Sequence, residues 1–249
     1  MSTFTKKLGM KKSPSLSLNF DRPLTTVDVV VFTAKENALH VLLVKRPSGR
    51  QEPFPERWAL PGGFVDTAVD ASLEACAMRK LKEKTGVDAP YLEQLGSWGD
   101  AERDPRGWST THVYFTLLPL DSIQLDQGSQ TREAQWFSIS GEGIDFELAF
   151  DHGLILEAAV QRLRNKAEYT SLPAYLLPAE FTLPQLQSAY EVVLGRPMDK
   201  SAFRTRVLSA GLVEALEGRS TGAYRPAQLY KLQSPGDLTY FPRTFSPKR

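Results

Sequence analysis

The chain has little cysteine or histidine and no long apolar run, and each shortage excludes a class of protein. Its one cysteine, Cys76, cannot form an internal disulfide, and its three histidines show no metal-ligand spacing. The most hydrophobic stretches, 27–32 and 39–44, are far shorter than the ~20 residues that span a bilayer. No segment near the start has the apolar core of a secretory signal. We therefore expect a cytoplasmic protein with no membrane partner, no structural zinc and no redox chemistry.

The chain also lacks an excess of either charge, although its charges are unevenly distributed. It has 30 Lys and Arg against 29 Asp and Glu, and its 41% of hydrophobic residues is typical of a globular protein with a sizeable core. Residues 1–20 hold four lysines and no acid, and residues 195–231 hold seven cations and three acids. Such stretches are usually solvated faces, but they bind nucleic acid when the fold presents them on one surface.

The first part of the chain has the pattern of an α+β or mixed-sheet domain. Apolar and β-branched runs predict strands at 25–33, 39–45, 91–98, 111–119 and 134–139. Helical spacing of apolar residues predicts a helix over 73–85, and the periodic, proline-free segment 150–166 leads into a proline-containing link at 171–178. The link has the composition of a domain hinge, and we place the boundary near residue 160.

The second part of the chain is punctuated as two helices and a hairpin. The helix at 182–194 has a threonine at its N-cap, a proline in its first turn and a glycine after its end. A second amphipathic helix follows at 200–210, and 212–216 with 227–232 predict a hairpin. Helix, turn, helix and basic hairpin together describe a winged helix-turn-helix.

The second of these helices has a polar face suited to DNA. That face carries Lys200, Ser201, Arg204 and Thr205. The opposite positions, which can face the core, hold Phe203, Val207 and Leu208. Because arginine can read guanine edges in the major groove, Arg204 and Arg206 are the preferred candidates for base contacts. The alternative interpretation is a solvated helix face.

A glycine loop and the helix after it resemble a known motif. Residues 60–65 (Leu-Pro-Gly-Gly-Phe-Val) and 79–87 (Arg-Lys-Leu-Lys-Glu-Lys-Thr-Gly-Val) resemble the Nudix box of pyrophosphohydrolases. The match is incomplete, because two extra residues separate Gly63 from Arg79 and the family's first glutamate falls on Ala71.

The departure concerns the metal ligands of the motif. In catalytic Nudix boxes, carboxylates at positions i, i+3 and i+4 share one helix face and hold Mg²⁺ beside a pyrophosphate. Here those positions are Lys80, Glu83 and Lys84. The change from three carboxylates to two lysines and one glutamate turns three negative charges into a net charge of +1. Because one charge contact at ~4 Å is worth ~4 kcal/mol at an effective dielectric of about 20, this face should repel a divalent metal. We therefore expect no metal, no catalytic residues and no cofactor. The two lysines can instead attract phosphate groups; the alternative is an ordinary helix with a solvated Lys/Glu face.

Three further segments, 45–47, 58–64 and 103–109, look like those that surround the ligand in ADP-ribose-type Nudix proteins. A pair of guanidinium groups suits a pyrophosphate, and aromatic rings suit a stacked adenine. The resemblance implies these ligand-binding residues: Arg46, Trp58, Gly63, Phe64, Arg79, Lys80, Glu83, Arg103, Arg106, Trp108 and Ser109. Core packing is the alternative for the two tryptophans, and an exposed loop is the alternative for Arg103 and Arg106.

From about residue 24 to 232 the chain is similar to the Nudix-related transcriptional regulators of NAD metabolism, the NrtR-type family. The similarity includes the segments quoted above, Phe-Thr-Leu-Pro at 181–184, and Phe203 with Arg204 and Arg206. It implies an α+β protein in which a Nudix-like α/β/α sandwich precedes a winged helix-turn-helix, acting as a homodimer. The implied partners are double-stranded operator DNA and, as effector, ADP-ribose or a related NAD metabolite, with repression of NAD-related genes as the expected role.

The resemblance also assigns parts of the chain. The expected division is a flexible basic arm at 1–22, a ligand-sensing domain at 23–160, a winged helix at 161–235 and a loosely ordered tail at 236–249. The expected DNA-binding residues are Lys200, Ser201, Arg204, Thr205 and Arg206 on the helix, with Arg219, Tyr224 and Arg225 in the wing.

Two alternatives remain open. In the first, Glu83 with Asp70, Glu74 or other acids rebuilds a metal site despite the lysines, and the protein is an active Nudix hydrolase of ADP-ribose-type substrates. In the second, the winged helix serves dimerisation and the protein is a protein-binding adaptor.

Overall fold

A seven-stranded mixed sheet forms the first domain in the computed structural model, which describes residues 21–123, 133–219 and 226–241. Its strands are β1 (Leu24–Lys35), β2 (Ala38–Lys45), β3 (Trp58–Ala59), β4 (Gly62–Phe64), β5 (Glu93–Asp100), β6 (Ser109–Leu117) and β7 (Ala134–Ser138). The order is β3-β2-β1-β6-β5, with β4 paired to β1 and β7 paired to β2. The pairing of β1 with β6 is parallel, and the other strand pairs are antiparallel.

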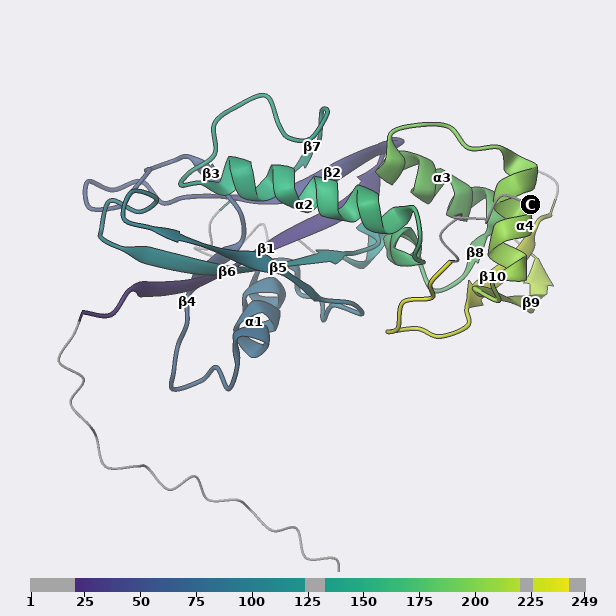
Figure 1. Cartoon of the computed structure of the whole chain (residues 1–249), viewed down its shortest axis with the longest axis horizontal. Helices are drawn as coiled ribbons and strands as arrows, with labels where there is room; N and C mark the ends of the chain where they lie inside the picture. Colours follow the sequence, from purple (N-terminus) through teal and green to yellow (C-terminus); the bar gives the residue numbers. More distant parts are fainter. Residues whose placement is uncertain (1–20, 124–132, 220–225, 242–249) are drawn as a thin grey trace, which may run out of the picture.

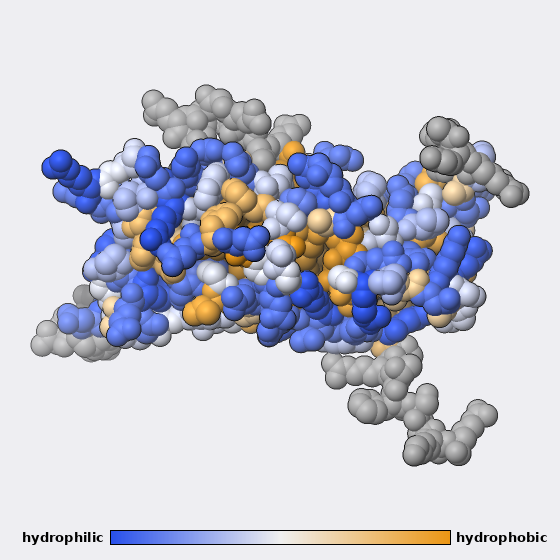
Figure 2. Space-filling model, turned by 90° about the horizontal axis from the view of Figure 1, so that it is seen from above, coloured by the Kyte–Doolittle hydropathy of each residue, from blue (hydrophilic) through white to orange (hydrophobic). Residues whose placement is uncertain are grey.

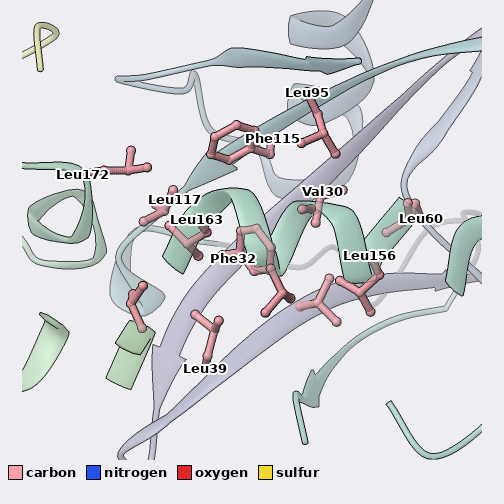
Figure 3. Close-up of a cluster of buried hydrophobic side chains, with 14 of the residues drawn as sticks. Val30, Phe32, Leu39, Leu60, Leu95, Phe115, Leu117, Leu156, Leu163 and Leu172 are labelled. Atoms are coloured by element: carbon pink, nitrogen blue, oxygen red, sulfur yellow. The ribbon is translucent and has the colours of Figure 1, made fainter. Parts of the chain in front are cut away.

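Two helices cover opposite faces of this sheet: α1 (Leu73–Thr85) on one and α2 (His152–Ala167) on the other (Figure 1). Alternate residues of β1 therefore enter two different cores. Val30 and Phe32 join the cluster under α2, which Figure 3 shows with Phe115 and Leu163, whereas Val29 joins the cluster under α1. A strand buried on both faces reads as a continuous apolar run, as 29–32 does.

The second domain has the arrangement of a winged helix. It contains α3 (Leu183–Leu194), α4 (Lys200–Ser209) and a three-stranded sheet of order β8-β10-β9, formed by β8 (Phe181–Thr182), β9 (Val213–Arg219) and β10 (Gln228–Leu232). A capping box between Thr182 and Gln185 begins α3, and Gly195, at a φ of 66°, ends it. The predicted α+β fold and winged helix are confirmed.

The two domains share part of one core. Ala189 and Val193 of α3 pack in the same cluster as Leu163 of α2, and the short 3₁₀ helix η2 (Leu172–Leu176) contributes Leu172. A second 3₁₀ helix, η1 (Leu120–Ser122), follows β6. Seen from above, apolar side chains gather toward the middle of the long axis between more polar ends (Figure 2). The boundary predicted near residue 160 falls inside the continuous helix α2, so the exact division into domains stays a prediction.

The tail differs from the expectation of loose order over its described part, 236–241. Phe241 is buried, its N–H donates to the Tyr169 carbonyl at 2.8 Å, and the Ser171 N–H donates to the Thr239 carbonyl at 2.9 Å. These residues therefore run back from the wing hairpin and bind the segment that joins α2 to η2. The polar, proline-rich composition gave no sign of this long-range pairing.

The described residues contain no helix that is both long and apolar enough to cross a bilayer. The basic arm up to residue 20, the wing candidates Tyr224 and Arg225, and tail residues 242–249 lie outside the described part of the chain.

Candidate functional site

A cleft lies over the α2 face of the sheet, at the N-terminal end of β1, where Thr26 and Asp28 precede the apolar side chains of the strand. It is lined by Thr26, Asp28, Val44, Arg46, Ala59, Leu60, Gly62, Gly63, Phe64, Arg103, Asp104, Arg106, Phe150 and His152. Five residues predicted to bind ligand therefore meet here from separate parts of the sequence: Arg46, Gly63, Phe64, Arg103 and Arg106. The lining of the cleft combines apolar side chains, such as Val44, Leu60 and Phe150, with charged ones.

Each arginine of the cleft is paired with a carboxylate. Arg46 lies 2.9 Å from Glu52, and Arg106 lies 2.7 Å from Asp104. Arg103 is the most buried of the three, with its side chain 3% exposed, and it binds Asp151 through two hydrogen bonds of 2.7 and 3.0 Å. An anionic ligand in the cleft must compete with these carboxylates for the guanidinium groups.

Ser109 belongs to the same arrangement, although it does not line the cleft. Its buried hydroxyl accepts a hydrogen bond of 3.2 Å from Nη1 of Arg103. Ser109 therefore orients Arg103.

Aromatic rings cover two of these arginines. The Arg46 guanidinium lies 4.7 Å from the centre of the Phe150 ring, and that of Arg106 lies 5.0 Å from the centre of the Phe64 ring. Phe150 has a φ of +57° and contacts Phe54, whose φ is +54°, edge to face at 4.9 Å. Left-handed backbone at two bulky residues is strained and persists only where the surrounding structure imposes it.

Asp28 and His152, which no sequence motif singled out, form the floor of the cleft. His152 Nδ1 accepts a hydrogen bond from the Leu60 N–H at 2.9 Å, so the ring proton lies on Nε2, 3.5 Å from Asp28 Oδ2. Burial disfavours the Asp28 carboxylate, but His152, the Thr111 hydroxyl at 2.7 Å and Arg103 together hold the pKa of Asp28 below its ordinary value. One signal was present in the sequence: Asp28 interrupts an otherwise apolar run.

The glycine loop brings its backbone close to both β1 and α1. A Cβ at Gly62 would lie 1.9 Å from Asp28 Oδ1, and Gly63 has a φ of +152°. A Cβ at Gly63 would meet Lys80 Nζ at 3.2 Å, so the Lys80 ammonium lies directly against this loop. A groove next to the cleft is lined by residues 62–67 with Arg79 and Lys80.

The metal-ligand face of the Nudix helix, α1, is occupied by cations and their partners. Arg79 binds Asp70 through two hydrogen bonds of 2.7 and 2.8 Å and also donates to Glu83 at 2.9 Å, and Lys80 Nζ lies 3.7 Å from Glu83. Across the described part of the chain there is no group of three or more His, Cys, Asp or Glu that could hold a metal ion. Because Asp70 and Glu83 are already paired with cations of this helix, the residues present do not fit the divalent ion that the Nudix fold implies.

The two tryptophans do not line the cleft. Trp58 packs edge to face on Phe137 at 4.8 Å, against the main core. Trp108 is 52% exposed, and its carbonyl accepts a hydrogen bond from the Leu24 N–H at 3.0 Å. The core-packing alternative thus describes the position of Trp58.

The second site is the outer face of α4, where Lys200, Ser201, Arg204 and Thr205 are exposed as predicted. Asp199 caps the helix by accepting from the Ala202 N–H at 2.7 Å, and Phe203 and Val207 anchor it in the winged-helix core. Leu208, which we expected to face the core, is instead 42% exposed, because it lies beyond the edge of the apolar stripe.

Arg206 is turned away from this face. Its guanidinium lies 4.8 Å from the centre of the Phe241 ring, and Nη2 donates to the Glu168 carbonyl. At 3.6 residues per turn, a residue two positions after Arg204 lies on nearly the opposite side of the helix. The side chain of Arg219, in β9, lies outside the described part.

Comparison with known proteins gives the same two-part division. Residues 22–157 match the NUDIX domain, and residues 173–232 match the NrtR DNA-binding winged helix domain. The chain is 44% identical over 225 residues to the ADPR responsive transcriptional repressor NtrR of Acinetobacter baylyi, covering 90% of this chain and 88% of that protein. It is 32% identical over 156 residues to the ADP-ribose pyrophosphatase of Methanocaldococcus jannaschii, covering 62% of this chain and 83% of that one.

Solved structures of a third relative, Shewanella oneidensis NrtR, are similar as well. The structure of that protein complexed with a 27mer DNA is 42% identical with a TM-score of 0.76, covering 84% of this chain and 93% of that chain. The structure of its NUDIX domain complexed with ADP ribose is 42% identical with a TM-score of 0.51, covering 58% of this chain and 90% of that chain.

Proposed function

This chain belongs to the NrtR family, and from that premise we propose that it is a transcriptional repressor that binds operator DNA and responds to ADP-ribose or a related NAD metabolite. The observation that carries this function is the presence, in one chain, of a cleft with three arginines and a separate exposed basic helix face. The sequence similarity to a repressor described as ADPR responsive extends over both.

The proposed DNA-binding surface consists of the exposed residues of α4, and the family resemblance adds Arg219, Tyr224 and Arg225 of the wing. Lys200, Ser201 and Thr205 set the register of the helix on phosphates, and Arg204 reads a base edge in the major groove. A homodimer presents two such helices to the DNA, so its two-fold symmetry requires an operator with two half-sites. Regulation of genes in this way places the protein in the cytoplasm.

The effector binds in the cleft. The guanidinium groups of Arg46, Arg103 and Arg106 attract its diphosphate, and Lys80 with Arg79 extends the positive surface into the adjoining groove. Asp28, held ionised at the floor, accepts hydrogen bonds from hydroxyl groups of the sugar. The proposed contacts of Trp58, Trp108 and Glu83 rest on the family resemblance alone.

The protein binds the effector without hydrolysing it. Lys80 and Lys84 stand where the family motif has carboxylates, and the residues that the structure describes include no group of three or more His, Cys, Asp or Glu that could hold Mg²⁺. The second candidate function, hydrolysis of ADP-ribose, is favoured by the 32% identity to an ADP-ribose pyrophosphatase. Release of AMP from ADP-ribose in the presence of Mg²⁺ would establish that activity, and Lys80→Glu with Lys84→Glu tests whether the missing carboxylates account for its absence.

The deciding experiment is fluorescence anisotropy of the full chain on DNA from upstream of its own gene and of neighbouring NAD-metabolism genes, without added metal. We expect tight, salt-sensitive binding that ADP-ribose weakens. No sequence-specific binding in either condition would contradict the proposed function. Binding no steeper in salt than a chance contact would favour the adaptor alternative.

A further inference from the structure

Helix α2 contacts both proposed sites. Figure 1 shows it running along the sheet from the side of β3 to the side of α3. Its first residue, His152, lines the cleft, and the residue that follows its last turn, Glu168, contacts α4. At 1.5 Å per residue, its 16 residues span about 24 Å.

The start of α2 is held by a side chain of the cleft. Asp151 occupies the N-cap position, but its carboxylate makes no capping hydrogen bond and instead binds Arg103. The preceding residue, Phe150, is the strained one with a φ of +57°. The ion pair with Arg103 is therefore one of the contacts that hold the start of this helix, beside the hydrogen bond from the Leu60 N–H to His152.

The other end of α2 contacts α3, α4 and the link between them. The Glu168 carbonyl accepts from Arg206 of α4, and the Glu168 carboxylate binds Arg196, in the link between α3 and α4, at 2.7 Å. One turn earlier, Arg164 Nε donates to the Val193 carbonyl of α3 at 3.2 Å. A displacement of this end changes the support of α4, the helix proposed to enter the major groove and called the recognition helix below.

The middle of α2 transmits a displacement because it is packed on the sheet. Its inward residues Ile155, Leu156, Ala159, Val160 and Leu163 are fully buried. Close-packed elements of this kind move as units rather than bend locally.

We propose that Asp151 is a positioning residue that couples the effector cleft to the recognition helix. The proposal rests on the proposed function and adds its route. A bound diphosphate and Asp151 require the same donors of Arg103, so the ligand takes Arg103 from Asp151 and releases the start of α2. The protein with α2 held by Asp151 and the protein with α2 released then differ in their affinity for ligand and for DNA, as coupling requires.

The test compares Asp151→Asn with the unmodified chain in two binding assays, ADP-ribose by titration calorimetry and operator DNA by anisotropy. In the unmodified chain we expect saturating ADP-ribose to weaken DNA binding about 5- to 150-fold, the usual range of coupling. In Asp151→Asn we expect tighter ADP-ribose binding and weaker DNA binding without ligand. The DNA-affinity ratio, meaning the DNA affinity without ADP-ribose divided by that with saturating ADP-ribose, should lie within about twofold of 1. Simple structural damage would weaken ligand binding instead.

Asp104→Asn is the matched control. It removes the partner of Arg106 in the same cleft, but Asp104 lies on a loop and not at the start of α2. We expect it to change ADP-ribose affinity while the DNA-affinity ratio stays that of the unmodified chain. Equal loss of the ratio in both variants would overturn the assignment to Asp151.

A second variant, Arg206→Met, tests the far end and keeps the proposal testable if Asp151→Asn does not fold. We expect it to bind ADP-ribose normally and to lose most of the ratio. A full ratio in either folded variant overturns the proposal while leaving the proposed function intact. An unmodified chain that binds DNA but shows no response to ADP-ribose refutes the proposed function and this route with it.

Discussion

The two arginines of α4 should affect DNA binding in different ways, although they carry the same charge and lie two residues apart. Arg204 is on the exposed face, whereas Arg206 faces the Phe241 ring and the Glu168 carbonyl. Replacing each with methionine removes the charge and keeps most of the aliphatic stem. We therefore expect Arg204→Met to remove a DNA contact and Arg206→Met to remove none.

The magnitude follows from counterion release. Each cation on phosphate contributes about 0.9 to the slope of log affinity against log salt. One lost contact therefore changes the ratio of the affinities of the unmodified chain and the variant by about 3.5-fold when the salt concentration rises fourfold. If Arg204 instead pairs with a guanine edge, its loss costs about 1–3 kcal/mol at a single salt concentration, which is about 5- to 150-fold. Arg206→Met should leave the slope at its unmodified value.

The assay is anisotropy of a labelled operator fragment at several potassium chloride concentrations, with a scrambled fragment as reference. A loss of sequence preference in Arg204→Met confirms a base contact, and a lower slope with the sequence preference unchanged indicates a phosphate contact. The reasoning is refuted if Arg206→Met lowers the slope as much as Arg204→Met, because the guanidinium would then have to leave its place against Phe241 and reach the DNA.

Three further predictions concern the stability and chemistry of the first domain. Gly62→Ala should destabilise the protein by about 1–3 kcal/mol, because its Cβ would lie 2.6 Å from a backbone carbonyl of β1, whereas Gly153→Ala in α2, with nothing within 4 Å, should stabilise it by up to about 1 kcal/mol; similar urea midpoints for both would contradict this. Arg79 holds the pKa of Asp70 well below its ordinary value, so the stability lost in Asp70→Asn should be greatest near neutral pH and should shrink as pH falls below about 4. A difference in urea unfolding between the two proteins that stays constant across that pH range would refute the ion pair. Burial raises the pKa of the Cys76 thiol to about 11, so iodoacetamide at about pH 8 should label it only after denaturation, and rapid labelling of the folded chain, followed by mass spectrometry, would show that the thiol is exposed.

Much of the fold could be predicted because its signals are local. The apolar run at 27–32 predicted β1, and the threonine and glycine that flank α3 predicted both of its ends. Periodicity and capping depend on residues within a turn or two of each other, so they can be read along the chain without knowledge of the fold. The order of elements then led to the two domain types.

Part of the candidate site could be predicted for a different reason. Arg46, Gly63, Phe64, Arg103 and Arg106 were found because short motifs resemble a known family, and all five line one cleft. The motif gave no information about their partners. Asp28 and His152 lie on β1 and α2, far apart in the sequence, and only the packing of α2 on the sheet brings them together.

The partners of a side chain on a helix were also beyond the sequence. The helical period puts Arg206 on the other side of α4 from Arg204, but only the fold shows that it meets the Phe241 ring and the Glu168 carbonyl there, since Phe241 folds back from beyond the wing. The amino-acid sequence thus predicted the elements and the two domain types, because each is encoded within a short stretch. The pairing of Arg103 with Asp151, the buried Asp28 and the contact of Arg206 with Phe241 depend on distant segments, and such contacts exist only once the whole chain has packed.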